Sequence, residues 1–257
     1  GDWFMAIHPS TWLHDPAGGM AVQPGRVGIV GLGLIGGSLG LDLQARGWTV
    51  QGLVHRQATA DRAMARGLVG AVSTDPHCLA DCDLVIEAVY ESMDVKKDVF
   101  GKLDDVVKQG AILASNTSYL DVDEIATATA RPGYVVGMHF FSPAHLMKLV
   151  EVVRGQHTGR CALQGVLALT KAMGKVGVVV GNCDGFVGNR VLDPYSYEAV
   201  FCIEEGASPL LVDAALNSGK GVAALKMAAA NAARAAAPSF RCPSADSSRQ
   251  TAGTRRG

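Results

Sequence analysis

The sequence predicts an α/β fold, in which a doubly wound, mainly parallel sheet is followed by a truncated all-helical C-terminal domain. Three observations support this prediction. A glycine-rich turn lies between an apolar strand and a helix near the start of the chain. Short apolar runs then alternate with segments of helical periodicity as far as about residue 180. Beyond Asp184 only the helical spacing continues, which indicates a second, helical domain.

The strands and helices are expected to alternate along most of the chain. Compact apolar runs predict strands at 27–30, 49–54, 83–89, 111–114, 134–140, 149–153 and 176–180. Apolar residues at helical spacing, often followed by glycine, predict helices at 34–46, 59–66, 94–108, 121–130, 163–173, 186–203 and 209–216. Strands that alternate with helices form a mainly parallel sheet that is covered on both faces.

Composition divides the 257 residues into four expected parts. Residues 1–24 lack clear periodicity and are expected to form a flexible leader. Residues 25–182 are the expected nucleotide-binding domain, and 183–217 a partial helical domain. Residues 218–257 form an atypical basic tail rich in Ala and Arg. From Asn217 onward seven basic residues accompany one acidic residue, whereas the whole chain has a net charge of −1.

The composition excludes several classes of protein. With 48 % hydrophobic and 18 % charged residues, a wholly disordered chain is excluded. We expect no membrane partner, because no apolar run is long enough to cross a bilayer. The near-neutral charge gives no argument for a nucleic-acid partner. None of the six cysteines forms a C-x-x-C pair, so we expect reduced thiols, a cytoplasmic protein and no metal site.

The glycine-rich turn fits the pattern G-x-G-x-x-G. Gly31 permits a tight turn, Gly33 lets the backbone approach a pyrophosphate, and Gly36 permits close packing of helix against strand. Leu34 and Ile35 begin the helix, whose N-terminus favours negative charge. In this strand–turn–helix context the pattern predicts a Rossmann-type domain that binds NAD or NADP, rather than a glycine turn of another α/β protein.

The end of the second predicted strand bears on the choice of cofactor. NAD sites usually place an acidic residue there to bind the ribose hydroxyls. This chain has Val54, His55 and Arg56 instead. The Arg56 guanidinium could pair with the 2′-phosphate of NADP, which predicts that NADP is tolerated. The alternative is a solvated surface arginine.

Four stretches further along the chain carry a resemblance to a known family. They are DLVIEAVYESMDVKKDVF, GAILASNTSYLDVDEIA, GMHFFSPAHLMKLVEVVRG and CDGFVGNR. In order and spacing, residues 81–216 resemble the 3-hydroxyacyl-CoA dehydrogenase family, especially the dehydrogenase part of bacterial fatty-acid oxidation enzymes. The resemblance implies hydride transfer between the 3-hydroxyl carbon of a 3-hydroxyacyl-CoA and NAD(P), in fatty-acid β-oxidation or related acyl-CoA metabolism. It also implies an acyl-CoA partner and a homodimer.

The same resemblance implies a catalytic pair. His139 in GMHFFSP matches the family's base, and Glu151 in LVEVV matches the acid that holds its imidazole. The chemistry is reasonable by itself, because imidazole titrates near neutral pH and a carboxylate fixes its tautomer. The two residues are expected on neighbouring strands. Outside this motif, a core histidine and an edge-strand charge would be the simpler interpretations.

Five further residues are assigned by the resemblance. Ser118 and Asn189 match residues near the substrate oxygen, where a hydroxyl and an amide can donate hydrogen bonds; a turn serine and a helix-cap asparagine are the alternatives. Ser118 is also expected beside the cofactor. Glu91 and Lys96 match a pair beside the cofactor, and the alternative is a surface charge pair. Ser142 stands where many relatives carry Asn next to the nicotinamide.

The sequence departs from the family in two regions. Residues 54–83 leave room for one short helix and a loop, where the family has a long helical arm. Residues 26–60 look more like arogenate or prephenate dehydrogenases, which often use NADP. The family's helical domain is expected to be present only to about Leu216. We therefore expect weak or absent turnover. The truncation also argues against the homodimer that the family forms.

Two other functions stay open on the sequence alone. One is an NADP-dependent arogenate or prephenate dehydrogenase, based on residues 26–60. GMHFFSP and LVEVV argue against it, because those enzymes use a different catalytic histidine context. The other is a non-catalytic nucleotide-binding fragment.

Overall fold

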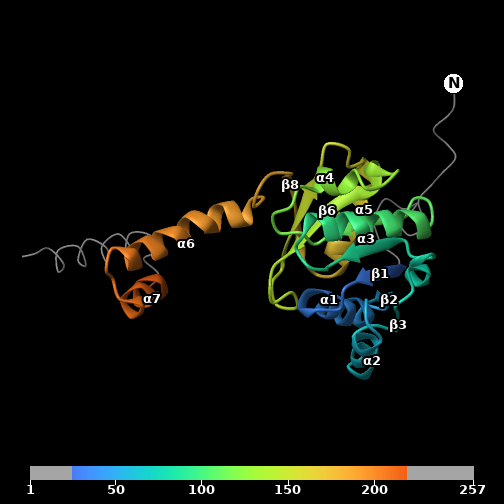
Figure 1. The fold of residues 1–257 in the computed structure, drawn as a ribbon, viewed down its shortest axis with the longest axis horizontal. Coiled ribbons are helices and arrows are strands. Elements are labelled where there is room, and N and C mark those ends of the chain that lie inside the picture. Colours follow the sequence, from blue (N-terminus) through green and yellow to red (C-terminus); the bar gives the residue numbers. More distant parts are fainter. Residues whose placement is uncertain (1–24, 219–257) are drawn as a thin grey trace, which may run out of the picture. The chain divides into compact units, whose positions relative to one another are not determined.

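The structure is a computed structural model that describes residues 25–218 (Figure 1). The expected leader at 1–24 and the expected basic tail beyond Ser218 lie outside the described residues. The chain falls into two compact units that divide between Val191 and Leu192. Within residues 25–218, no helix is both long and apolar enough to span a bilayer.

One eight-stranded sheet organises the first unit. Its strand order is β3-β2-β1-β4-β5-β6-β7-β8. Every neighbouring pair is parallel except β6 and β7, which run antiparallel. The strands are β1 (Arg26–Val30), β2 (Thr49–Leu53), β3 (Ala71–Ser73), β4 (Leu84–Glu87), β5 (Ile112–Ser115), β6 (Val135–Phe140), β7 (Leu149–Arg154) and β8 (Val176–Gly181). The order 3-2-1-4-5-6 confirms the doubly wound Rossmann-type sheet. The order reverses between β1 and β4, the place where sheets of this kind bind ligands.

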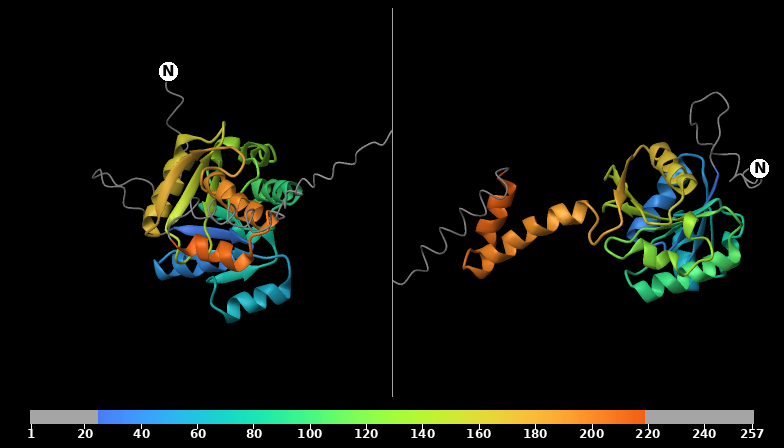
Figure 2. Two further views of the ribbon diagram at one scale, coloured as in Figure 1. Left: turned by 90° about the vertical axis from the view of Figure 1, so that its left-hand side faces the viewer. Right: turned by 90° about the horizontal axis from the view of Figure 1, so that it is seen from above.

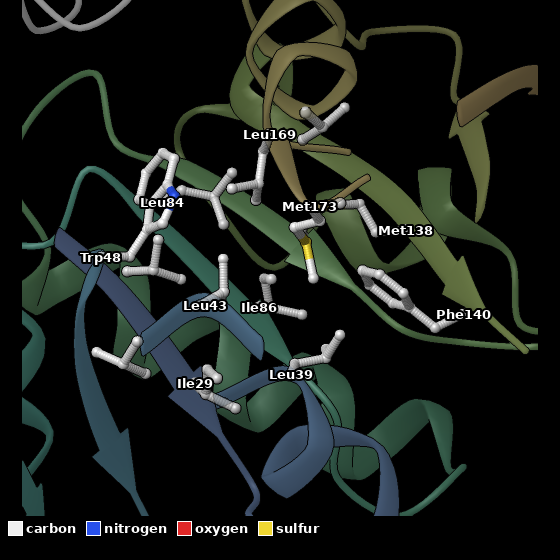
Figure 3. Packing of buried hydrophobic residues seen from close by; sticks show 14 of the residues in the cluster. Ile29, Leu39, Leu43, Trp48, Leu84, Ile86, Met138, Phe140, Leu169 and Met173 are labelled. Atoms are coloured by element: carbon white, nitrogen blue, oxygen red, sulfur yellow. The ribbon is translucent and has the colours of Figure 1, made fainter. Parts of the chain in front are cut away.

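Helices cover both faces of this sheet (Figure 2). The helices of the first unit are α1 (Leu34–Ala45), α2 (Gln57–Ala65), α3 (Met93–Val106), α4 (Val122–Ala126) and α5 (Arg160–Ala172). Side chains of α1 and α5 pack into one buried cluster, of which Leu39, Leu43, Leu169 and Met173 appear in Figure 3. Side chains of α3 and α4 pack into a second cluster on the opposite face. The predicted two-sided covering of the sheet is therefore confirmed.

The second unit consists of helical chain in its described part. It holds most of α6 (Gly188–Glu204) and all of α7 (Pro209–Asn217), which match the two helices expected after Asp184. Its small core contains Cys202, Ala207 and Val212. The Ser208 hydroxyl caps α7 by accepting a hydrogen bond from Leu211 N at 3.2 Å.

Two local expectations were wrong. No strand is predicted at β3, because a run of three residues is too short to show alternation. A helix was expected over 121–130, but α4 ends at Ala126. Thr127 and Thr129 donate their hydroxyls to the carbonyls of Glu124 and Ala126, and such side-chain bonds favour turns over continued helix.

Candidate active site

The glycine turn lies at the carboxyl end of β1, where the strand order reverses. Gly31 has φ +87°, and a Cβ there would stand 2.7 Å from the carbonyl oxygen of Ala88. A Cβ on Gly36 would stand 2.0 Å from the carbonyl oxygen of Gly31. The fold itself therefore requires both glycines, as the sequence motif suggests.

Gly33 differs from its two neighbours, because a Cβ there would meet nothing within 4 Å. It is also the N-cap of α1, and no side chain caps this helix by a hydrogen bond. Leu34, the first helical residue, is 72 % exposed. An open, uncapped helix N-terminus reached over a residue without a side chain suits a pyrophosphate, so the residues present fit a dinucleotide.

The residues that follow β2, where NAD and NADP sites differ, lie where the sequence predicts them. β2 ends at Leu53, and Val54, His55 and Arg56 follow at the same edge of the sheet. His55 and Arg56 are exposed, and Arg56 is the N-cap of α2. This edge therefore offers a cation where an acid would bind the ribose hydroxyls.

His139 and Glu151, the pair that the resemblance implies is catalytic, are in direct contact. They face each other across β6 and β7, and His139 Nδ1 lies 2.8 Å from Glu151 Oε2. Both residues are buried, with exposed fractions of 5 % and 2 %. In the tautomer whose Nδ1–H donates to this carboxylate, Nε2 keeps its lone pair and can act as a base.

The second oxygen of Glu151 is also engaged. Glu151 Oε1 accepts hydrogen bonds from the backbone N–H of Val187 at 3.0 Å and of Gly188 at 2.8 Å. The aromatic rings of Phe141 and Phe186 lie 4.5 and 5.8 Å from the imidazole ring of His139, measured between centroids. Sequence reasoning missed the two N–H groups, because backbone donors leave no signature in residue type.

Ser118 and Asn189, which lie far apart in the sequence, are brought together. Asn189 Nδ2 donates a hydrogen bond to the carbonyl oxygen of Ser118 at 3.1 Å. Ser118 follows β5 and Asn189 belongs to the first turn of α6. The amide of Asn189 is thus held against the loop that carries the Ser118 hydroxyl.

Glu91 organises that same loop. Its Oε1 accepts hydrogen bonds from Thr117 Oγ1 at 2.5 Å, from Ser118 N at 2.8 Å and from Tyr119 N at 3.3 Å. Burial raises the pKa of Glu91, but these hydrogen bonds and the charge of Lys96 outweigh it and hold the pKa below its usual value. Glu91 is therefore a stable anion near neutral pH.

Lys96 is fully buried rather than part of a surface charge pair. Its Nζ lies 2.8 and 2.9 Å from the two carboxylate oxygens of Glu87 and 3.3 Å from Glu91 Oε2. Ser115 Oγ donates a further hydrogen bond to Glu87 at 2.7 Å. The three carboxylate oxygens around Nζ, two from Glu87 and one from Glu91, match the three N–H donors of an ammonium group. Lys96 thus acts on the site through Glu87 and Glu91.

Glu87 is a site residue that sequence reasoning missed. It ends β4 and is fully buried. The available signal was an acidic residue inside the apolar run DLVIEAV, followed nine residues later by a lysine. A buried acid with no partner would be costly, so such a residue calls for a cation nearby.

Ser142 lies at the border of the site. It is exposed, two residues after the end of β6, and a cis peptide bond joins it to Pro143. Lys175 Nζ holds the following loop by hydrogen bonds to the carbonyls of Ala144 and Met147 at 2.5 and 2.9 Å. Within residues 25–218, no group of three or more His, Cys, Asp or Glu is arranged to hold a metal ion.

The site residues share one edge of the sheet. β1, β4, β5 and β6 are parallel, so their carboxyl ends lie together. The glycine turn follows β1, Glu91 follows β4, Ser118 follows β5, and His139 is the next-to-last residue of β6. This edge can hold a dinucleotide beside an imidazole base and two further hydrogen-bonding groups.

Comparison with known proteins gives two family matches. Residues 55–183 match the 3-hydroxyacyl-CoA dehydrogenase NAD binding domain, and residues 185–234 match the 3-hydroxyacyl-CoA dehydrogenase C-terminal domain. The second match continues past Asn217, where the change of charge suggested a boundary. The glycine turn precedes the first match.

Individual relatives agree with these matches. The peroxisomal bifunctional enzyme of Danio rerio is 56 % identical over 138 residues, which are 54 % of this chain and 19 % of the relative. The peroxisomal fatty acid beta-oxidation multifunctional protein MFP2 of Arabidopsis thaliana is 44 % identical over 145 residues, or 56 % and 20 % of the two chains. The chain thus spans about a fifth of the length of these relatives.

A solved structure matches over a larger share of its length. The (S)-3-hydroxybutyryl-CoA dehydrogenase PaaH1 from Ralstonia eutropha has a TM-score of 0.71 and 32 % sequence identity. The match covers 76 % of this chain and 77 % of that chain. The likeness therefore includes both the sheet and part of the chain that follows it.

Proposed function

The chain belongs to the 3-hydroxyacyl-CoA dehydrogenase family and carries its NAD-binding domain, and on this premise we propose that it transfers a hydride between a 3-hydroxyacyl-CoA and NAD(H). The observation that carries the proposal is the buried His139–Glu151 pair, joined at 2.8 Å at the sheet edge that also bears the glycine turn. A base and a dinucleotide cradle at one edge are the two parts that alcohol oxidation requires.

The chain's own residues supply the proton chemistry. NAD, held at the glycine turn, would supply the acceptor for the hydride from C3 of the substrate. His139 Nε2 takes the proton of the 3-hydroxyl group, whose oxygen then forms the carbonyl of a 3-oxoacyl-CoA. Glu151 orients the imidazole and stabilises its cationic form. In the reverse direction His139 returns the same proton to the oxygen.

Other residues of the edge bind and orient. Ser118 and Asn189 are proposed to donate hydrogen bonds to the substrate oxygen, because Asn189 is held on the Ser118 loop. Gly31, Gly33, Leu34, Ile35 and Gly36 are proposed to cradle the pyrophosphate. Glu91, Lys96, Ser118 and Ser142 are proposed to border the nicotinamide half, with Lys96 acting through Glu91.

The biological setting is also a proposal. Relatives named for fatty-acid β-oxidation support a role in that pathway. Within residues 25–218, the cysteines at positions 78, 82, 161 and 183 are free thiols, which favours a reducing compartment. The sequence predicts the cytoplasm, whereas two relatives are named peroxisomal. Immunolocalisation of the untagged protein distinguishes these compartments. Dimerisation stays a prediction.

Turnover with defined substrates tests the proposed function. Purified full-length chain is mixed with acetoacetyl-CoA and NADH, and the loss of NADH fluorescence is followed. We expect weak turnover that depends on acetoacetyl-CoA, and none with prephenate or arogenate and NADP⁺. Activity on prephenate or arogenate alone would contradict the proposal. Tight NADH binding without any turnover would contradict it too, and would favour a non-catalytic domain.

A further inference from the structure

We propose that the start of α6 positions the His139–Glu151 pair. The backbone N–H groups of Val187, just before the helix, and of Gly188, its first residue, hold Glu151 in line with His139, and glycine at position 188 makes this contact possible. The inference rests on the proposed function of His139 and Glu151. It adds residues that act through Glu151 and touch neither cofactor nor substrate.

The two carboxylate oxygens of Glu151 have different hydrogen-bond partners. Oε2 lies 2.8 Å from His139 Nδ1, while Oε1 accepts the N–H groups of Val187 and Gly188 at 3.0 and 2.8 Å. The residue is 2 % exposed, so solvent contributes little to its stability. A buried carboxylate needs hydrogen-bond donors to stay ionised, and the N-terminal end of a helix adds a favourable dipole. The helix start thus fixes the direction of the Glu151 carboxylate.

The backbone before α6 is shaped to deliver these donors. Phe186 is a non-glycine residue with φ +48°, and it is fully buried. Few side chains adopt such a φ, and residues held in this region are concentrated at functional sites. Its ring lies 5.8 Å from that of His139. The turn at Phe186 therefore packs against the imidazole and aims the next two N–H groups at Glu151.

Glycine at position 188 is needed because Phe141 occupies the space beside it. A Cβ on residue 188 would stand 2.6 Å from Phe141 Cζ and 3.4 Å from Glu151 Oε2. The Phe141 ring cannot retreat freely, since its centroid is 4.5 Å from that of His139. A larger residue must displace either the helix start or the ring. Either movement disturbs the His139–Glu151 geometry.

A matched glycine provides the control. Gly181 ends β8, and a Cβ there would meet nothing within 4 Å. Gly181→Ala therefore makes the same chemical change without the collision. Phe141→Leu removes the ring atom that the new Cβ would strike, so the double variant Gly188→Ala/Phe141→Leu offers a rescue that a general loss of stability would not show.

Two readouts follow the pair directly. In the full-length chain without cofactor, proton NMR detects the His139 Nδ1–H as a strongly downfield imidazole signal, which Glu151→Gln assigns by its loss. Steady-state kinetics with acetoacetyl-CoA and NADH gives kcat and KM separately. We expect Gly188→Ala to shift or broaden the signal and to lower kcat about tenfold with KM for NADH within about twofold. Gly181→Ala should match wild type in both readouts.

The rescue decides between positioning and general damage. We expect the double variant to regain at least about threefold in kcat over Gly188→Ala and to restore the imidazole signal. If Gly188→Ala does not fold, the double variant is compared with Phe141→Leu alone, and a matching signal supports the packing argument. A Gly188→Ala protein whose signal and kcat equal those of Gly181→Ala would overturn the inference. If wild type shows no turnover, the proposed function fails, and the imidazole signal alone still decides the positioning role.

Discussion

His139 and Glu151 are directly opposed residues on β6 and β7, the antiparallel pair of the sheet, and their side chains meet at 2.8 Å. Opposed residues of antiparallel strands have Cβ atoms about 4.5–5.5 Å apart on the same face. A slip of one residue would send Glu151 to the other face. The strand register therefore brings the two residues of the proposed catalytic pair together.

Removing the charge of Glu151 tests its role as the partner of His139. Glu151→Gln keeps the shape but can present an amide N–H to Nδ1 and so favour the wrong tautomer. By analogy with other His–carboxylate pairs, we expect kcat to fall about 10²- to 10⁴-fold. Titration should show NADH affinity within about twofold of wild type. An unchanged kcat would show that the carboxylate does not serve the imidazole.

The glycine turn allows a comparison of two alanine substitutions. Gly33→Ala adds a Cβ in open space, so the melting temperature should stay near that of wild type while NADH affinity falls at least about tenfold. Gly36→Ala places a Cβ 2.0 Å from the carbonyl oxygen of Gly31, so it should destabilise the fold by about 1–3 kcal/mol. Thermal unfolding and NADH titration measure both effects. If the Gly33→Ala variant binds NADH as tightly as wild type, the pyrophosphate does not bind against Gly33.

Arg56 predicts how the chain treats the two nicotinamide cofactors. Arg56→Asp replaces the cation after β2 with the acid that NAD sites usually carry. We expect the Kd for NADPH to rise at least about tenfold, and the Kd for NADH to fall or stay within about twofold. Arg66→Asp, at the far end of α2, is the matched control. If both substitutions change the Kd for NADPH equally, Arg56 is an ordinary surface arginine that does not bind the 2′-phosphate.

Glu91 gives a prediction about pH. Its pKa in the folded chain is lower than the usual 4.5. Burial raises this pKa, but the hydrogen bonds to Glu91 and the charge of Lys96 lower it by more. Such a group binds fewer protons when folded, so it stabilises the fold above the unfolded pKa and loses this contribution as pH falls through the folded pKa. Glu91→Gln should therefore be less stable than wild type near neutral pH.

The same substitution should matter less in acid. The difference in urea midpoint between Glu91→Gln and wild type is expected to narrow as pH falls below about 4.5. Asp98→Asn, in the exposed Lys102 pair, controls for the loss of a surface charge. A difference that grows toward acid pH would contradict the assignment of Glu91 as a stabilised anion.

Periodicity in the sequence was sufficient for most of the sheet. The buried strands read as apolar runs, and the helices between them showed their spacing, so the alternation and the two-sided covering could be predicted. The strand β3 could not be predicted, because three residues at the sheet edge are too few to show hydrophobic periodicity. α4 ended early because Thr127 and Thr129 bond the preceding carbonyls, a competition that residue spacing does not reveal.

The candidate site was predictable where side chains carry it and obscure where the backbone does. The sequence predicts His139 and Glu151 on neighbouring strands, and the structure pairs them. Lys96 was expected beside the cofactor, but its burial on Glu87 depends on how α3 lies across β4. The N–H groups that hold Glu151 come from a turn after β8, and no residue type in the sequence signals them.

Single-turnover hydride transfer by His139→Asn tests the central claim most directly. The Asn amide can still donate to Glu151 but offers no titratable base at the position of Nε2. Enzyme in excess is mixed with NADH and acetoacetyl-CoA, and NADH oxidation is followed. The account predicts a rate at least about 10²-fold below wild type with unchanged NADH affinity. A rate within about threefold of wild type would show that the proton is carried by another group.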